Sequence, residues 1–393
     1  MENSFSKLKE IKDALNAKFY EREAEVEAIL IALLSRQHVL MVGPSGTAKS
    51  ALAIEFAKII QGSHYFQWLL TRFSTPEELF GPLSLKDLEQ GVYKRNTEAK
   101  MPEANIVFLD EIFKANSAIL NSLLTIINER FFYNDGSPVN VPLISVIGAS
   151  NEYPEEGEGL EALFDRFLLR FEVEYIVDDS NFISMMKNAG QNVQIPTITM
   201  ENLKHFQTLS DTVIIPDEVF KAISKIRKEL RDEGIRPSDR RFKQSLSILK
   251  ARALIRNRNV VRVEDIVILE NVVWETIDQK DTVSFIVRRH AQDNVIQKLD
   301  SIQSEVSDVY NAIKHDNSVE AGMEATQKMK ALERDLNRLK MSQQGRDVEI
   351  DAMLVKVKSI QQEILNSVLE PMFFDALHVK NEIEESSGIF YRM

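Results

Sequence analysis

A short segment near residue 45 has the composition and spacing of a phosphate-binding loop. Its residues are Gly43, Pro44, Ser45, Gly46, Thr47, Ala48, Lys49 and Ser50. An apolar run over residues 38–42 precedes it, and a helical pattern follows from residue 51. In such a strand–loop–helix unit, backbone N–H groups and the helix N-terminus converge on the β- and γ-phosphates of a nucleotide. Lys49 would add positive charge, and Ser50 would offer a hydroxyl to Mg²⁺.

One position of this loop departs from the usual pattern, which has glycine immediately before the lysine. Here that position is Ala48. An ordinary glycine-rich turn that happens to precede a lysine is the alternative interpretation. The loop alone favours nucleotide binding, and a second, acidic motif strengthens that interpretation.

That acidic motif stands about sixty residues later, where the apolar run over residues 106–109 ends in Asp110 and Glu111. Ligands of parallel sheets bind at the C-terminal ends of the strands, so both carboxylates are expected beside the phosphates. Asp110 would hold Mg²⁺ through water, and Glu111 would polarise the water that attacks the γ-phosphate. A buried strand ending in two acids by coincidence is the alternative.

Three further polar sites complete the set, each with a plainer alternative. Asn151 follows the apolar run over residues 144–149 and could orient the attacking water, or it could cap a turn. Arg166 precedes another apolar strand and could stabilise charge on a neighbour's nucleotide, or it could form a surface ion pair. Arg240 and Arg241 begin a helix and could reach the γ-phosphate, or they could serve as helix-cap ion pairs.

The overall composition is that of a water-soluble globular protein of several domains. The 393 residues include 60 acidic and 48 basic side chains, a formal net charge of −12, which argues against nucleic acid as the main partner. Cysteine is absent, and the six histidines are scattered, so the sequence excludes disulfides and thiolate metal sites. No signal peptide is evident, and the longest apolar run, residues 28–34, is too short to cross a bilayer. We expect a cytoplasmic location.

The first part of the chain alternates short apolar strands with helices, the pattern of a parallel α/β sheet. Helical sequence over residues 5–35 precedes it, and residues 131–139 predict a hairpin that turns at Asp135-Gly136. The expected strands are Val39–Val42, Phe66–Leu70, Ile106–Leu109, Ile144–Ala149 and Leu169–Val173. We therefore predict a nucleotide-binding core over residues 1–177.

Helical periodicity dominates the rest of the chain. Residues 178–282 predict a helical lid, with one helix capped near Ser238 and another near Val263–Ile277. Residues 283–393 carry three heptad segments, with breaks near His315–Ser318 and Ser342–Gly345. This region predicts an all-α bundle or coiled-coil-like extension, although periodicity alone also allows these helices to pack on the body of the protein.

Taken together, these motifs resemble those of the AAA+ ATPases, and within them the MoxR family, most closely its regulatory ATPase variant A (RavA) group. The resemblance covers about residues 15–282, and alanine before the lysine is normal in this group. It rests on the 43–50 loop and on long matches at residues 20–22, 70–82, 107–115, 128–130, 149–152, 160–166 and 238–241. The implied fold is a P-loop AAA+ αβα core with a helical lid.

The resemblance also implies roles for individual residues. Lys49 and Ser50 would be the Walker A pair, Asp110 and Glu111 the Walker B pair, and Asn151 the first sensor. Arg166 looks like an arginine finger supplied to the adjacent subunit. Arg240 looks like the second sensor, with Arg241 the alternative, and Tyr20, Glu21 and Arg22 would border the adenine. Residues 73–95 and the hairpin at Asn134-Asp135-Gly136 match family insertions that face the central pore or the partner.

The implied activity is that of an ATPase that binds ATP and Mg²⁺ and forms a ring, expected to be a hexamer. It would remodel or activate a partner protein, for which the family suggests a von Willebrand factor A (VWA) domain. The family group carries a β-rich insert after residue 282 that docks a partner, and this sequence shows only helical heptads there. An ATP-gated scaffold is the alternative. A nucleic-acid motor, suggested by Arg252, Arg256, Arg258 and Arg262, is disfavoured because these arginines are expected to form one solvated helix face.

Overall fold

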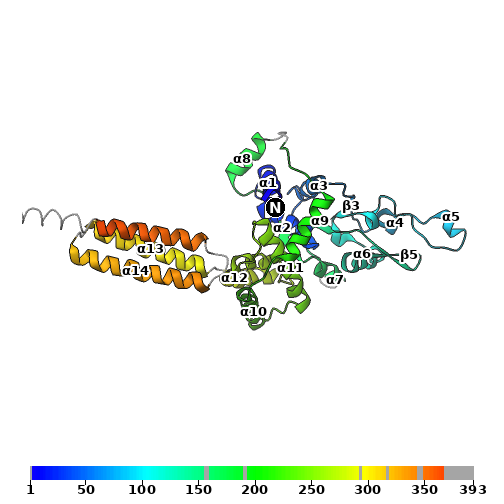
Figure 1. Cartoon of the computed structure of the whole chain (residues 1–393). Helices are drawn as coiled ribbons and strands as arrows, with labels where there is room; N and C mark the ends of the chain where they lie inside the picture. Colours follow the sequence, from blue (N-terminus) through cyan, green and yellow to red (C-terminus); the bar gives the residue numbers. More distant parts are fainter. Residues whose placement is uncertain are drawn as a thin grey trace, which may run out of the picture. The chain divides into compact units, whose positions relative to one another are not determined.

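The computed structural model describes residues 2–154, 159–188, 193–291, 294–315, 318–342 and 348–366 (Figure 1). The chain forms two compact units, one ending at Ala291 and one beginning at Gln292. Each unit has a hydrophobic core of its own.

The centre of the first unit is a five-stranded parallel sheet. Its strands, in the spatial order β3-β4-β7-β1-β8, are β3 (Tyr65–Leu69), β4 (Ile106–Asp110), β7 (Ser145–Ser150), β1 (Val39–Val42) and β8 (Leu169–Glu172). All residues of β1 and β7 are buried, as expected for a parallel sheet covered by helices. The predicted parallel α/β core is confirmed, and each of the five strands begins and ends within one residue of its expected bounds.

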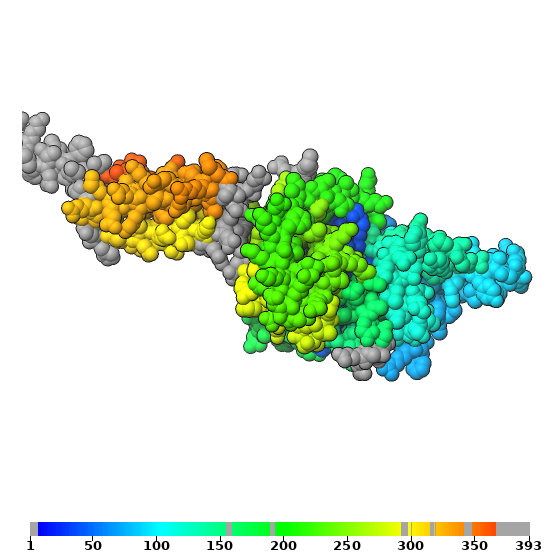
Figure 2. Space-filling model, turned by 90° about the horizontal axis from the view of Figure 1, so that it is seen from below, coloured from blue at the N-terminus to red at the C-terminus, as the bar shows by residue number. Residues whose placement is uncertain are grey.

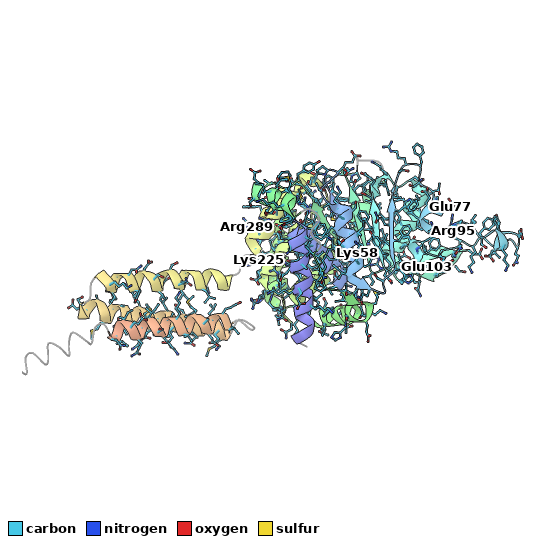
Figure 3. The ribbon with its side chains drawn as sticks, turned by 90° about the horizontal axis from the view of Figure 1, so that it is seen from above. Lys58, Glu77, Arg95, Glu103, Lys225 and Arg289 are labelled. Atoms are coloured by element: carbon cyan, nitrogen blue, oxygen red, sulfur yellow. The ribbon has the colours of Figure 1, made fainter. Side chains whose placement is uncertain are left out.

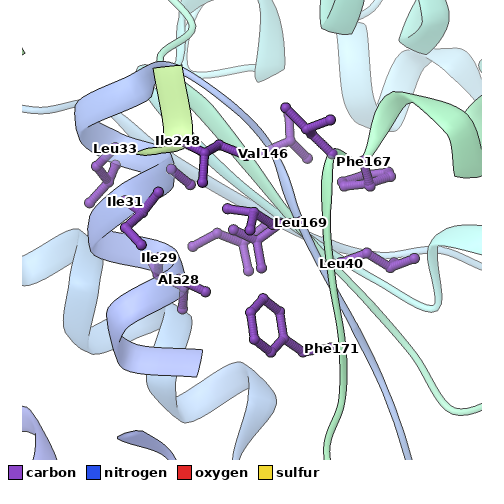
Figure 4. Close-up of a cluster of buried hydrophobic side chains, with 14 of the residues drawn as sticks. Ala28, Ile29, Ile31, Leu33, Leu40, Val146, Phe167, Leu169, Phe171 and Ile248 are labelled. Atoms are coloured by element: carbon purple, nitrogen blue, oxygen red, sulfur yellow. The ribbon is translucent and has the colours of Figure 1, made fainter. Parts of the chain in front are cut away.

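Helices flank this sheet. They are α2 (Glu23–Ser35), α3 (Lys49–Ile59), α6 (Ser117–Glu129) and α7 (Glu161–Arg166), and α1 (Glu2–Lys18) packs on α2. Helix α2 is buried along most of its length, because it lies between the sheet and the lid helices. Figure 4 shows its apolar side chains, among them Ala28 and Ile31, beside Leu169 and Phe171 of β8.

A buried histidine, His38, connects neighbouring segments at the N-terminal edge of the sheet through hydrogen bonds. The Val146 backbone N–H donates to Nδ1 of His38 at 2.9 Å, so Nε2 carries the ring proton and faces the Ile127 carbonyl at 3.2 Å. The Arg130 guanidinium lies 2.9 Å from the same Nε2. Burial, together with the charge of Arg130, holds the pKa of His38 well below its ordinary value of 6.5. The imidazole is therefore neutral in the folded protein.

Two insertions leave the core on the same side. One contains α4 (Pro76–Phe80), α5 (Leu85–Leu88) and the 3₁₀ turn η1 (Met101–Glu103), and the other is the hairpin β5 (Phe131–Asn134) and β6 (Ser137–Asn140). Asp135 accepts from the Tyr93 N–H at 2.9 Å, and Asn134 accepts from the Arg95 N–H at 2.7 Å. The two insertions are thus joined at their tips. In Figure 2 the light-blue segment around α5 extends beyond its neighbours, and Figure 3 shows Arg95 beside Glu77 at its base.

The remainder of the first unit is helical. It contains α8 (Asp179–Lys187), α9 (Met200–Thr212), α10 (Asp217–Asp232), α11 (Asp239–Ile255), η3 (Val263–Asn271), η4 (Ile277–Gln279), α12 (Lys280–His290) and the short strand pair β2 (Ile60–Gln61) and β9 (Ile198–Thr199). Helix α12 packs on η3 and α10, so this compact unit extends past residue 282. The helix expected at Val263–Ile277 is wrong in length and type, because a 3₁₀ segment ends at Asn271. Its start is fixed by the buried Asp265 carboxylate, which accepts from the Arg262 N–H.

The basic run of the lid does not form a solvated face, so that expectation is wrong. Arg252 is buried and pairs with Glu27 of α2 at 2.9 Å, and Arg258 pairs with the fully buried Asp265 at 2.6 Å. Arg256 lies 3.5 Å from Glu27, and Arg262 lies 3.8 Å from Glu264. Buried guanidinium groups need such partners. Arg252 and Arg256 therefore hold the lid to α2, whereas Arg258 and Arg262 form ion pairs within the lid.

The second unit consists of three helices in its described part. They are α13 (Asn294–His315), α14 (Val319–Ser342) and a helix over residues 348–366. Their heptad positions meet in a core that includes Val306, Met329, Leu336 and Val357. The bundle predicted from the heptads is confirmed for these residues. The expected break at Ser342–Gly345 falls mostly at residues 343–347, outside the described part. No helix that the structure describes has the length and apolar character to span a membrane.

Candidate active site

The loop between β1 and α3 has the backbone shape of a phosphate cradle. A Cβ at Gly43 would lie 2.0 Å from the Val173 carbonyl oxygen, so only glycine fits there. Gly46 has φ 84° and faces open space. Ala48 has φ 68° and ψ 16°, the left-handed region where glycine is preferred. The alanine adopts the glycine conformation, so the departure in sequence leaves the loop shape intact.

Lys49, the first residue of α3, points its ammonium group back into the loop. Its Nζ donates to the carbonyls of Gly43 at 2.6 Å and Pro44 at 2.9 Å, and lies 3.4 Å from Oδ1 of Asn151. Burial lowers the pKa of Lys49, while the charges of Asp110 and Glu111 oppose that shift. A buried cation held by neutral carbonyls is well prepared to bind an incoming phosphate, because the phosphate would supply the negative charge.

The two predicted carboxylates lie at the end of β4, directly beside this loop. The Ser50 hydroxyl donates to Asp110 Oδ2 at 3.3 Å. Glu111 is 8% exposed and has φ 50°, and its carboxylate accepts from the Asn151 side-chain amide. Its other oxygen lies 3.1 Å from Nζ of Lys114. The structure thus joins Lys49, Ser50, Asp110, Glu111 and Asn151 in one network.

The donor set of this network fits Mg²⁺ and a nucleotide. Magnesium prefers oxygen ligands and keeps several waters, binding through one or two protein groups and the phosphates. The adjacent Ser50 hydroxyl and Asp110 carboxylate are such groups. Gly46 faces open space, which leaves room for a phosphate to approach the loop backbone closely. The residues present therefore fit a magnesium–nucleotide complex.

A pocket of about 590 Å³ opens next to the loop. Its lining is mostly apolar and comes from the end of α1, the loop itself and the segment leading into α8: Lys18, Phe19, Tyr20, Arg22, Gly46, Thr47, Ala48, Tyr175, Ile176, Phe182 and Met185. An apolar pocket beside a phosphate cradle has the character of a site for a purine base. Tyr20 lines it as expected, and Tyr175, Phe182 and Met185 were not predicted.

Glu21 and Arg22 fix the wall of this pocket rather than lining it with free groups. Glu21 accepts from the N–H groups of Val177 at 2.8 Å and Asp178 at 2.9 Å, and these bonds lower its pKa. Arg22 donates to the Thr47 carbonyl at 3.2 Å and also to the carbonyl of Glu174. The sequence between α1 and α2 therefore ties the loop to the segment after β8.

The predicted arginines gather at a different place, around the carboxylate of Asp165. Arg166 lies 3.2 Å and Arg240 3.3 Å from the same oxygen, Oδ2. Arg241 lies 2.5 Å from Oδ1 and also donates to the Val272 carbonyl at 2.8 Å. Arg241 is 2% exposed, whereas Arg240 is about half exposed. Arg241 is therefore held in buried structural contacts, whereas the Arg240 side chain lies at the exposed side of the cluster.

Three residues of this region were missed at the sequence level. Lys114 contacts Glu111. The spacing of three residues between them could have predicted this contact, because it places both side chains on one turn. Asp165 binds both Arg166 and Arg240, but its position beside Arg166 in the sequence did not predict its contact with Arg240. Arg170 is buried against Phe164 and Trp274, in a strand whose sequence predicted only apolar packing.

The chain is similar to known proteins over most of its first unit. Residues 6–212 match the model of the MoxR domain in the MoxR-vWA-beta-propeller ternary systems, and residues 218–287 match an AAA lid domain. Two uncharacterized proteins of Methanocaldococcus jannaschii are similar. MJ0079 is 40% identical over 73% of this chain and 75% of its own length, and MJ0812 is 38% identical over 77% and 82%.

Two further matches are more distant. The chaperone MoxR1 of Mycobacterium tuberculosis is 31% identical over 38% of this chain and 40% of its own length. The crystal structure of an ATPase candidate from Cytophaga hutchinsonii has a TM-score of 0.61 and 18% identity, covering 73% of this chain and 94% of that one. It shows the shared fold alone. On the match to the MoxR domain model, which covers more than half of the chain, and on the match to the AAA lid domain, the chain belongs to the MoxR family of AAA+ ATPases.

Proposed function

We propose that this MoxR-family protein hydrolyses ATP at sites shared between adjacent subunits of a ring, expected to be a hexamer, and couples hydrolysis to the remodelling or activation of a partner protein. The observation that carries the proposal is the separation of two charge clusters. Lys49, Asp110, Glu111 and Asn151 form one hydrogen-bonded network. Among the described residues, Arg166 and Arg240 make no bond to it and bind Asp165 instead.

The arginine cluster has a strong excess of positive charge. Four guanidinium groups, those of Arg166, Arg170, Arg240 and Arg241, lie within 4.0 Å of the single Asp165 carboxylate. Arg166 also keeps a buried Nε without a partner among the described residues. Such a cluster favours an anion, and in a ring the γ-phosphate of the adjacent subunit supplies one.

The residues of the network have the chemistry that hydrolysis requires. Glu111 accepts the proton of the attacking water, and Asn151 orients that water, for which its amide must leave the carboxylate that it now contacts. Lys49 and the loop N–H groups hold the phosphates. Bound Mg²⁺, held by Ser50 and Asp110, would neutralise charge on the β- and γ-phosphates. Arg166, with Arg240 beside it, stabilises the charge that develops on the transferred group.

A VWA-domain protein is the partner class that we propose. The matching family model is described from MoxR-vWA-beta-propeller systems, and one relative is described as a chaperone. Assignment to the RavA group rests on the motif matches alone. We also propose that the protein acts in the cytoplasm.

The concentration dependence of turnover tests the shared site. We expect ATP turnover per subunit to rise with protein concentration in parallel with ring assembly measured by light scattering, because a monomer lacks the arginine of its neighbour. Full turnover per subunit in a demonstrably monomeric sample would contradict the proposal.

A trapped variant tests the partner. Glu111→Gln is expected to bind ATP without turning it over, and so to hold the ATP-bound state. A purified VWA-domain partner protein should bind Glu111→Gln with ATP at least ~10-fold more tightly than it binds Lys49→Ala. Equal affinity for both variants would remove nucleotide-dependent partner binding from the account.

A further inference from the structure

We propose that an aromatic cluster centred on Trp274 is a positioning device that holds Arg166 and Arg240 in place for the adjacent subunit's nucleotide. The cluster consists of Phe113, Tyr153, Phe164 and Trp274, with the guanidinium of Arg170 stacked on it. This inference rests on the proposed function, because it assigns a role to residues around a site that is shared between subunits.

Three of the four aromatic residues stand two positions from a residue with a proposed chemical role. Phe113 is two residues after Glu111, and Tyr153 is two residues after Asn151. Phe164 is two residues before Arg166, on the same short helix α7. The cluster therefore connects the segments that carry Glu111 and Asn151 of the subunit's own site with α7, which carries Arg166 for the adjacent subunit.

The rings pack directly on one another. Trp274 is fully buried, and its ring centroid lies 5.8 Å from that of Phe164 and 6.3 Å from that of Tyr153. The centroid of Phe164 lies 6.1 Å from that of Phe113. These distances are within the range of favourable aromatic contacts, and the large rings leave little freedom for α7 to shift alone.

Arg170 fastens this packing through hydrogen bonds to the backbone. Its guanidinium carbon lies 4.0 Å from the Phe164 ring and 5.2 Å from the Trp274 ring. It donates to the carbonyls of Phe167 at 3.0 Å, Trp274 at 2.5 Å and Phe164 at 3.3 Å. One buried side chain thus binds both α7 and the segment after η3.

The lid arginine is fastened to the same place. Arg241 donates to the Val272 carbonyl, two residues before Trp274, and to Asp165 of α7. Arg240 is its neighbour in α11. The position of Trp274 therefore sets the spacing between α7 and the start of α11, and with it the spacing between Arg166 and Arg240.

Replacing Trp274 should displace the arginines that a subunit supplies to its neighbour and leave the subunit's own nucleotide site intact. Trp274→Leu in the full-length ring should lower kcat about 10- to 100-fold, since misplacing a catalytic group by about 1 Å has that effect. Its ATP affinity should stay within ~2-fold of the wild-type value, because the pocket at residues 18–22, 46–48 and 175–185 is elsewhere. Trp274→Phe, which keeps an aromatic ring, should recover most of the activity.

Mixed rings separate this role from general loss of structure. Trp274→Leu subunits mixed with Glu111→Gln subunits should regain activity, because Glu111→Gln supplies correctly placed arginines to sites that have a normal base. Trp274→Leu subunits mixed with Arg166→Ala subunits should regain none, because neither donates a functional arginine. Phe206→Leu removes a buried ring of α9 that lies outside the cluster, and it serves as the matched control. This variant should change ATP turnover only slightly, and by the same amount in both mixtures.

Equal rescue in the two mixtures, or failure of both, would overturn the proposal. Mixing Arg166→Ala with Glu111→Gln tests the shared site itself. If that mixture is rescued while the two Trp274→Leu mixtures behave alike, the positioning role is wrong and the proposed function stands. If that mixture also fails in rings shown to contain both variants, the shared site is wrong.

Discussion

The side-chain amide of Asn151 donates a hydrogen bond to the carboxylate of Glu111, joining the ends of β7 and β4 at the phosphate loop. Lys49 Nζ lies 3.4 Å from the same Asn151 side chain. The phosphate loop and the ends of β4 and β7, which are distant in sequence, are therefore connected by the side chains of Lys49, Glu111 and Asn151. This connection is what converts separate motifs into one site.

Replacing Lys49 should remove nucleotide binding. Lys49→Ala deletes the only point charge of the loop and removes the hydrogen bonds that Nζ donates to the carbonyls of Gly43 and Pro44. We expect ATP affinity to fall at least ~100-fold, the loss of a buried charge-assisted contact worth about 3 kcal/mol. Titration with a fluorescent ATP analogue measures it. Lys58→Ala, which removes an exposed lysine of the same helix that pairs with Glu55, is the control. Unchanged affinity of Lys49→Ala would refute the phosphate-loop assignment.

The left-handed backbone at Ala48 makes a prediction about loop shape. Ala48→Gly should keep nucleotide affinity within ~2-fold and raise the unfolding free energy of the first unit by about 0.5 kcal/mol, since relief of left-handed strain slightly exceeds the added chain entropy. Ala48→Val should lower both, because a β-branched side chain tolerates this conformation poorly. Denaturant titration and nucleotide binding measure the two effects. A glycine variant that cannot bind nucleotide would show that the alanine side chain itself is needed.

His38 should make the first unit sensitive to acid. Its pKa is lower in the folded protein than the ordinary value of 6.5, so below that pH the unfolded chain binds more protons than the folded one. The unfolding free energy is unaffected by His38 above pH 6.5 and should fall by up to about 1.4 kcal/mol per pH unit as the pH decreases from there to the folded pKa. Denaturant titration followed by tryptophan fluorescence reports on this unit, because both tryptophans, Trp68 and Trp274, belong to it.

Two variants isolate the contribution of His38. His38→Gln should be less stable at neutral pH but should lose part of the pH dependence between pH 6.5 and 5. His64→Gln, which changes an exposed histidine, should keep the wild-type slope. If His38→Gln and the wild type lose stability in parallel over this range, the buried imidazole is not the source of the acid sensitivity.

Much of the core was predictable because its signals are local. Strands such as Ile106–Asp110 are continuous apolar runs, and the loop at residues 43–50 has a fixed spacing that one backbone shape satisfies. The heptads of the second unit likewise depend on residues only three or four positions apart. In each case the sequence itself contains the partners of the interaction.

The arginines were harder to place because their partners are distant in sequence. Arg252 had the spacing of a solvated helix face, yet Glu27, far away in α2, holds it in the interior. Asp165 pairs with its neighbour Arg166 and also with Arg240 and Arg241, which belong to the lid. No local sequence pattern indicates that these lid arginines bind Asp165. The 3₁₀ segment at Val263–Asn271 was missed for the same reason, since buried contacts of Asp265 override helical periodicity.

Mixed-ring complementation tests the central claim most directly, namely that Arg166 acts on the adjacent subunit's nucleotide. Arg166→Ala and Glu111→Gln should each be inactive alone, with turnover reduced at least ~100-fold. In a random 1:1 mixture, about one quarter of the sites would combine a normal Glu111 with a neighbour's normal Arg166, so turnover should return to roughly a quarter of the wild-type value. Turnover that stays at the level of the single variants, in rings shown by mass spectrometry to contain both, would contradict the account.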